Sequence, residues 1–145
     1  MRWIVFVVGG LIVIVVAIVV VGSMLPRTHT ASRTLRVRRT PTDVWPVITQ
    51  TAPASSVPVD VLENDPPRRL VTRVTAAERN FGGTWTILLT PTAEGSDVTV
   101  TEDGWVANPI FRFMSRYVMG HHATMDALLT SVAKTLGEDA RLSGQ

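Results

Sequence analysis

The sequence predicts an α+β fold: one long apolar helix at the N-terminus, about five antiparallel strands, and a long amphipathic helix at the C-terminus. Residues 3–25 contain no charged side chain. Between residues 32 and 102, short runs of alternating apolar and polar residues are separated by prolines, glycines and asparagines, which is typical of strands joined by short turns. From residue 110 to residue 136, apolar side chains recur at three- and four-residue steps, which is typical of an amphipathic helix.

The apolar run at the N-terminus is long enough to cross a membrane. As a helix it would extend for about 34 Å, whereas the hydrocarbon core of a bilayer is about 30 Å thick. A cleaved signal peptide is the main alternative. However, the run is longer than the roughly 7–15 apolar residues of such a signal, and residues 21–26 offer no clear pattern of small residues for cleavage. We therefore expect residues 1–26 to form a single-pass anchor, with a lipid-facing surface that includes Trp3, Ile4, Leu11, Ile18 and Leu25.

The basic residues are distributed unevenly around this span. Only Arg2 precedes it, whereas five arginines follow it within residues 27–39. The positive-inside rule therefore favours a cytoplasmic C-terminal domain. These arginines also fit the solvated face of a strand, and Arg27, Arg33 and Arg36 are candidates for contact with anionic lipid headgroups. Nucleic acid is not expected as a partner, because the net charge is only +2 and no aromatic pattern accompanies the arginines.

Local signals set the individual elements of the domain. A short helix is expected from Pro41, because Thr40 is a suitable N-cap and Asp43 follows three residues after it. Pro46 should keep this helix brief or kinked. The C-terminal helix should start at Asn108-Pro109, and Gly120 is a candidate bend within it. Alternating patterns predict strands over residues 32–39, 57–63, 69–75, 84–89 and 98–102.

Several short motifs occur in one order along the chain. They are Leu25-Pro26-Arg27-x-His29, Pro41-x-x-Val44-Trp45, PPRRLVTR at 66–73, FGGTW at 81–85, TEDG at 101–104 and NPIFRF at 108–113. This series resembles bacterial membrane-anchored members of the SRPBCC superfamily, the START-like group often labelled polyketide cyclase/dehydrase or lipid transport. The resemblance covers nearly the whole chain. It implies a helix-grip fold, in which an antiparallel sheet curls around the C-terminal helix and encloses an apolar cavity.

The chain departs from that pattern after its first short helix. Members of the group normally carry about two more strands before the strand expected here over residues 57–63, which starts at Val57 and ends at Glu63. A START-like domain over residues 27–140 should therefore have a shortened sheet, a cavity that is smaller or open on one side, and a flexible tail over residues 141–145. Pro58 falls on the exposed edge, where proline is tolerated and discourages further pairing. That edge could alternatively recruit a second copy of the chain.

We expect a membrane-tethered domain that binds a lipid or another hydrophobic molecule without catalysis, because an apolar ligand partitions into the membrane and a tether keeps a concave apolar site within reach of it. Glu102 is in phase with Val98 and Val100, so it should point toward the cavity, where Arg112 or Arg116 could pair with it. We assign no catalytic residue and expect no cofactor. A metal site at His121, His122 and Asp126 is not expected, because no third ligand is evident for a histidine and carboxylate four residues apart. The alternatives are an aromatase/cyclase-type enzyme acting through Glu102 and a membrane-bound interaction module using the sheet edge. The candidate cavity residues are Trp85, Ile87, Val98, Val100, Glu102, Phe113, Met114 and Tyr117.

Overall fold

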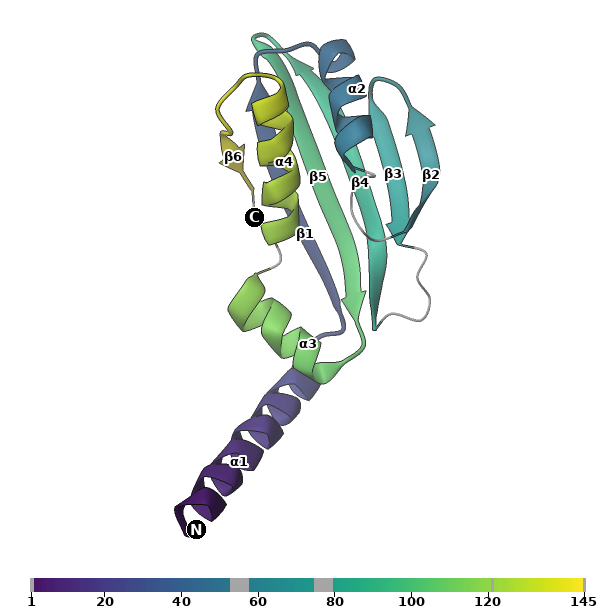
Figure 1. Ribbon diagram of the computed structural model, residues 1–145. Helices are drawn as coiled ribbons and strands as arrows, with labels where there is room; N and C mark the ends of the chain where they lie inside the picture. Colours follow the sequence, from purple (N-terminus) through teal and green to yellow (C-terminus); the bar gives the residue numbers. More distant parts are fainter. Residues whose placement is uncertain (1, 53–57, 75–79, 121, 145) are drawn as a thin grey trace.

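The computed structural model describes residues 2–52, 58–74, 80–120 and 122–144, and it has the predicted α+β architecture (Figure 1). Its described strands form one antiparallel sheet in the order β2-β3-β4-β5-β1-β6. The strands are β1 (Thr28–Val37), β2 (Val59–Asp65), β3 (Arg69–Val74), β4 (Phe81–Thr92), β5 (Gly95–Val106) and β6 (Leu142–Ser143). The helical elements are α1 (Arg2–Met24), α2 (Pro41–Thr51), α3 (Pro109–Met114), a π-helical turn η2 (Ser115–Met119) and α4 (Ala123–Thr135).

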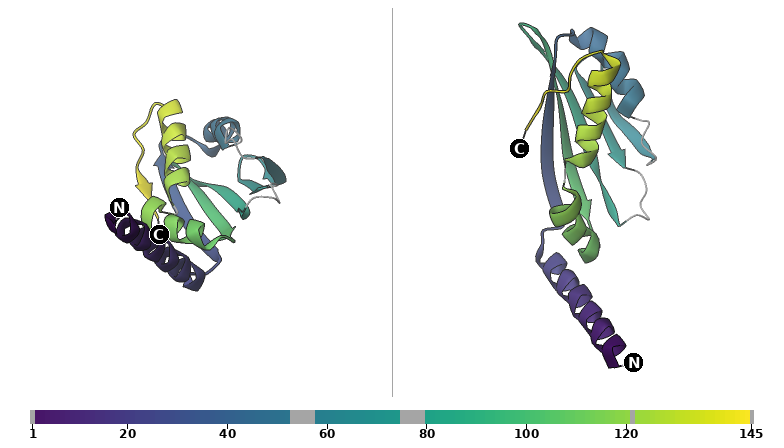
Figure 2. Two further views of the ribbon diagram at one scale, coloured as in Figure 1. Left: turned by 60° about the horizontal axis from the view of Figure 1, so that its bottom comes forward. Right: turned by 60° about the vertical axis from the view of Figure 1, so that its left-hand side comes forward.

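Helix α1 projects from the domain as a separate rod (Figure 2). Among the described residues it is the helix long and apolar enough to cross a membrane, and none of its most apolar stretch is buried within the protein. Gly22, close to its C-terminal end, is the one buried residue of the helix. A helix that is apolar on every side and unburied is not stable in water, because its side chains have nothing apolar to contact. The expected anchor residues Trp3, Ile4, Leu11, Ile18 and Leu25 all belong to this helix or directly follow it.

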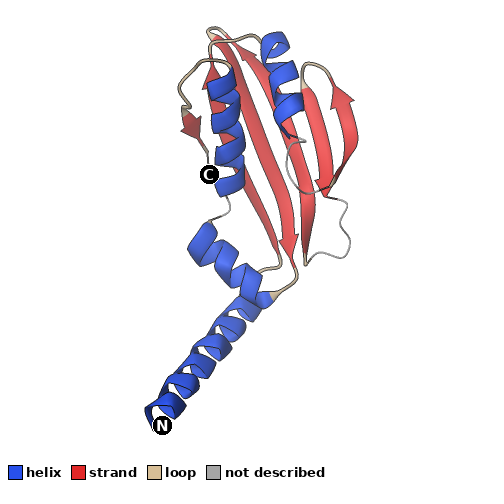
Figure 3. Cartoon of the chain, in the orientation of Figure 1, coloured by secondary structure: helices blue, strands red, loops and turns tan. Residues whose placement is uncertain are grey.

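The core lies between one face of the sheet and the helices α2 and α4, which Figure 3 shows on the same side. The caps expected from the sequence are present. The Thr40 hydroxyl accepts a hydrogen bond from the Asp43 amide, and the Asn108 side chain accepts one from the Ile110 amide at 2.8 Å. Helices α2 and α4 each bury one stripe of side chains against the sheet. The core consists of Ala31, Leu35, Val37, Val44, Ile48, Leu70, Ile87, Leu89, Val98, Val100, Met125, Leu129, Val132 and Ala133.

The predicted C-terminal helix is interrupted, which corrects the expectation of one continuous helix over residues 110–136. It divides into α3, η2 and α4, and Gly120 between η2 and α4 has a φ of 73°. This is the left-handed region, which glycine adopts without steric cost, so the predicted bend is a complete break. Only α4 packs against α2 and β1. The segment before Gly120 packs mainly against α1.

Two further expectations concern the edges of the sheet. Residues 141–145 were expected to be a flexible tail, but Leu142 and Ser143 form β6 and pair with Leu35 and Thr34 of β1. Leu142 is half-buried and packs against the core, which favours this pairing.

The opposite edge is β2, as predicted, and Val57 lies outside the described residues. Exposed acidic side chains and a bulge between Val61 and Glu63 discourage pairing with another strand, so self-association through this edge stays a prediction.

Candidate functional site

The strand register places Glu102 on the face of the sheet that carries the core. Glu102 pairs across the sheet with Ala31 on β1 and with Trp85 on β4, and the next inward row contains Val100 and Ile87. Ile87, Val98 and Val100 are fully buried, whereas the Glu102 side chain is 23% exposed. On this face of β5, Glu102 is therefore more exposed than the two valines that precede it.

The Glu102 carboxyl lies in a partly apolar environment. Burial raises its pKa, while a hydrogen bond donated by Trp85 and the nearby His122 act in the opposite direction. A carboxyl with a raised pKa is protonated more readily, and it can then donate a hydrogen bond as well as accept one. This property suits recognition of a polar group on an otherwise apolar molecule.

His29 lies beside Glu102 on the neighbouring strand. Its Nε2 is 3.6 Å from Glu102 Oε1, and the histidine side chain is 19% exposed. Burial lowers the pKa of His29, and the charge of Asp103 opposes that shift. The ring lies over Gly104, where a Cβ atom would collide with it, so glycine at that position allows the histidine to approach the carboxylate.

His122 completes a group that we call the polar cluster: His29, Trp85, Glu102 and His122. The Nδ1 atom of His122 is buried and has no hydrogen-bond partner within the described part of the chain. On β1, His29 is the second residue of the strand, and Ala31, the partner of Glu102, lies roughly 10 Å from the start of the strand at about 3.3 Å per residue. Three members of the cluster come from different strands of one sheet face, and the fourth precedes α4.

The partners expected for Glu102 are different in the structure. Arg112 does not pair with it. Instead, its Nη1 donates to the Leu25 carbonyl at 2.7 Å and its Nη2 donates to the Ala107 carbonyl at 3.3 Å. Arg116 is exposed on η2. The sequence predicts an arginine partner for Glu102. It does not show that the Leu25 and Ala107 carbonyls accept the hydrogen bonds of Arg112 instead.

The three headgroup candidates occupy different environments. Arg27 immediately precedes β1 at the α1 end, but Arg33 points inward and pairs with Asp126 at 2.9 Å. Arg36 lies near the far end of β1 and donates to both oxygens of Asp97 at 2.8 and 3.0 Å. The strand carries Arg36 about 30 Å from Arg27, at 3.3 Å per residue, and both Arg33 and Arg36 have acidic partners within the protein. Contact of these arginines with lipid headgroups stays a prediction, and Arg27 is the one that lies next to α1.

The aromatic and methionine candidates from the C-terminal segment are separated from the sheet candidates. Phe113 and Met114 are half-buried on α3, and neither packs against the core. Tyr117 is 60% exposed on η2, and its ring centroid lies 5.0 Å from that of Phe113. Ile87, Val98 and Val100 pack against other core residues, and Trp85 contacts the edge of the core.

Within the described residues, no group of three potential metal ligands is present. His121 lies outside the described residues, and Asp126 is the partner of Arg33.

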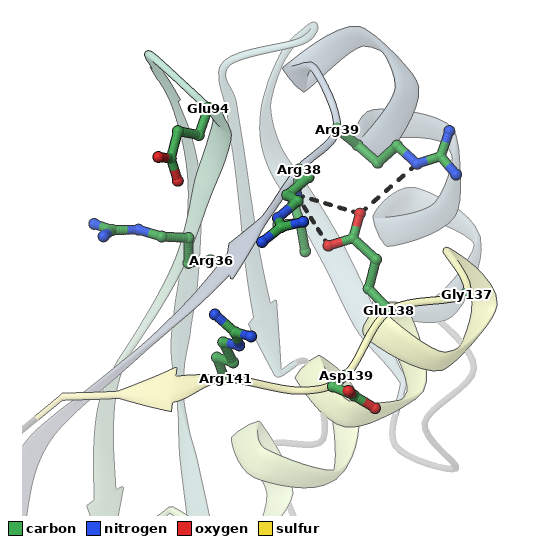
Figure 4. A pocket seen from close by; sticks show the side chains of 9 residues that line it. Arg36, Arg38, Arg39, Glu94, Gly137, Glu138, Asp139 and Arg141 are labelled. Carbon is green, nitrogen blue, oxygen red and sulfur yellow. Dashed lines mark hydrogen bonds and ion pairs between the residues drawn. The ribbon is translucent and has the colours of Figure 1, made fainter.

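A hollow of about 480 Å³, drawn in Figure 4, lies at the end of the domain that Figure 1 shows farthest from α1. Glu138 accepts hydrogen bonds from the Arg38 amide at 3.0 and 3.2 Å, and it lies 3.7 Å from Arg39. The hollow is lined by four arginines and three acidic residues, so it favours neither an apolar ligand nor a strong anion. The lining residues are Arg36, Val37, Arg38, Arg39, Glu94, Gly137, Glu138, Asp139 and Arg141.

Comparison with solved structures defines the fold class. A conserved protein from Geobacillus kaustophilus is 13% identical, with a TM-score of 0.59 over 79% of this chain and 99% of that chain. Protein MLL2253 from Mesorhizobium loti is 16% identical, with a TM-score of 0.57 over 77% of this chain and 97% of that chain. The Polyketide_cyc-like protein Cgl2372 from Corynebacterium glutamicum is 14% identical, with a TM-score of 0.42 over 78% of this chain and 86% of that chain.

No family model matches the chain, and no curated protein matches it. The structural likenesses establish the fold alone: both neighbours share the α+β fold of this chain, in which helices pack against an antiparallel sheet.

Proposed function

We propose that this protein is a membrane-tethered START-like domain that binds a lipid or another hydrophobic molecule without catalysing a reaction. The observation that carries the proposal is the position of the polar cluster. It lies on the largely apolar inner face of the sheet, where the Glu102 and His29 side chains are partly exposed, and at the end from which α1 leaves the domain. An apolar ligand partitions into the membrane, and a tether keeps a concave apolar site within reach of it.

The polar cluster would contact the head of such a ligand. A half-buried carboxyl with a raised pKa, an indole N–H and two imidazoles provide both donors and acceptors. We propose that the aliphatic part of the ligand lies against Trp85 and the adjoining apolar surface. The domain would lie on the cytoplasmic side, because basic residues follow the span in excess of those that precede it.

The test is to purify the full chain in detergent and to identify co-purified apolar molecules by mass spectrometry. Trp85→Ala is the site variant, and Leu88→Ala is its control on the same strand, since Leu88 is exposed on the other face of the sheet. We expect a bound molecule in the wild type and in Leu88→Ala but not in Trp85→Ala. Equal loss in both variants, or an empty wild type, would contradict the proposal.

A second candidate function is acid–base chemistry on the bound molecule, and the proximity of His29 to Glu102 supports it. A carboxyl with a raised pKa can act as a general acid, and a histidine beside it can exchange the proton. If a reaction occurs, the wild type and Glu102→Gln should retain molecules of different mass, because the variant would hold unconverted substrate. Identical bound molecules in the two proteins would exclude Glu102 as a catalytic residue.

A further inference from the structure

Exposed apolar side chains gather at one end of the domain. Outside α1, nine large apolar side chains of the described residues are exposed, and six of them lie on α3, on η2 or at the adjoining ends of β4 and β5. Phe111 is 55% exposed and Val118 is 63% exposed. These six residues are Phe81, Trp105, Ile110, Phe111, Tyr117 and Val118, and we call them the apolar belt.

The position of the belt is fixed by contacts with the end of α1. The backbone carbonyl of Pro109 lies so close to Gly22 that a Cβ atom there would overlap it. Arg112 is only 8% exposed and donates to the Leu25 carbonyl, just past the last residue of α1. The start of α3 therefore lies level with the last turn of α1.

The orientation of α3 matters as much as its position. Figure 1 shows α3 running across the end of α1 instead of continuing its direction, and Figure 2 shows the two helices in contact from other sides. When α1 crosses a membrane, a segment held across its end lies along the membrane surface. The exposed residues of α3 and η2 recur at positions 110, 111, 117 and 118, which is the spacing of one helix face.

We infer that α3 and η2, together with the ends of β4 and β5, insert the apolar belt into the interfacial layer of the bilayer that α1 crosses. Four of the six residues are aromatic, and tyrosine and tryptophan are favoured at the boundary between headgroups and acyl chains. Arg116 is exposed on the same segment, and Arg27 immediately precedes β1, so both are placed to meet anionic headgroups. This inference rests on the membrane-tethering part of the proposed function, and it holds whether or not the domain binds a ligand.

The absence of cysteine from the whole sequence allows a direct test by single labelling. Phe111→Cys and Val118→Cys, each in the full chain, are labelled with an environment-sensitive fluorophore and reconstituted into vesicles of phosphatidylcholine and phosphatidylglycerol. Leu88→Cys is the matched control, because Leu88 is also an exposed apolar residue but lies on β4 seven residues from Phe81. Val15→Cys reports on α1 itself. The lipids carry a nitroxide quencher either near the glycerol backbone or near the end of the acyl chain.

The inference expects the shallow quencher to remove most of the emission from positions 111 and 118 and little of the emission from position 88. The deep quencher should act on position 15. If position 15 is quenched but positions 111 and 118 behave like position 88, the apolar belt does not enter the bilayer and the inference is wrong. Insertion of α1 into the membrane would still be supported. If position 15 is also unquenched, membrane tethering itself fails. Ile110→Cys provides a second exposed position on the same face if one labelled variant does not fold.

Discussion

Arg112 provides the sharpest test of how helix α1 is joined to the domain. Its guanidinium is buried and donates one hydrogen bond of 2.7 Å to the Leu25 carbonyl and a longer one to Ala107. Replacing it by alanine leaves the Leu25 carbonyl without this donor at the end of α1, where the last carbonyls have no partner within the helix.

The magnitude follows from the number of hydrogen bonds that are lost. A hydrogen bond to a charged group contributes about 1.5–3 kcal/mol, and an unsatisfied buried acceptor costs about 1–3 kcal/mol. The Nε of Arg112 is buried without a partner among the described residues, so the wild type already carries an opposing cost. We therefore expect Arg112→Ala to lower the free energy of unfolding by about 2 kcal/mol. For a domain of this size, that loss lowers Tm by roughly 8 °C.

The assay is thermal unfolding of the full chain in detergent, followed by intrinsic tryptophan fluorescence. Arg116→Ala is the matched control, since Arg116 is exposed on the same segment and should change stability by less than about 0.5 kcal/mol. Equal Tm values for the two variants would refute the reasoning, because the burial and bonding of Arg112 would then have no energetic consequence.

Three further outcomes are expected. Gly22→Ala should displace α3 and expose the following segment to protease, whereas Gly10→Ala, which has open space around it, should not; equal cleavage in both would contradict the close approach. Leu129→Ala should destabilise the domain by about 2–5 kcal/mol, and Leu88→Ala by about 0.5 kcal/mol or less, in chemical denaturation; similar losses would show that α4 does not bury its stripe. Glu102→Gln should gain Tm relative to the wild type between pH 4 and pH 7. The raised pKa of Glu102 makes the wild type lose stability as the pH rises from about 4.5, its ordinary value, through the higher pKa of the folded state, and a difference that is constant with pH would contradict this.

Much of the fold could be predicted from local signals. The alternation of Val98, Val100 and Glu102 is a property of an extended strand, so it correctly placed Glu102 on the inner face before any partner was known. The caps at Thr40 and Asn108 depend on residues within three positions of each other, and both are present. The edge position of β2 also follows from Pro58 and its acidic neighbours.

The break at Gly120 could not be predicted with the same certainty, because periodicity shows that a helix has an apolar face but not what that face contacts. Ile110, Met114 and Tyr117 recur at helical spacing, as do Met125, Leu129 and Val132. The first set lies on the segment packed against α1, whereas the second set faces the sheet. One uninterrupted pattern therefore covers two different environments.

The other residues missed by sequence analysis are paired over long distances along the chain. His29 reaches Glu102 because β1 begins at Thr28, whereas the sequence pattern predicted a start at residue 32. In the longer strand, His29 is an even number of residues from Leu35 and therefore lies on the same face of the sheet. The roles of Arg112 and Gly22 depend on α3 returning to the end of α1, more than eighty residues away, and nothing in their local sequence indicates it.

The most direct test of membrane-linked ligand binding is photo-crosslinking of the full chain in bilayers that contain a phospholipid with a diazirine on its acyl chain. Peptide mapping should find crosslinks around Trp85 and Glu102 on the inner face of the sheet, in addition to those on α1. Crosslinks confined to residues 2–24 would show that the protein is anchored but that its sheet does not accept an acyl chain, and the proposed function would be wrong.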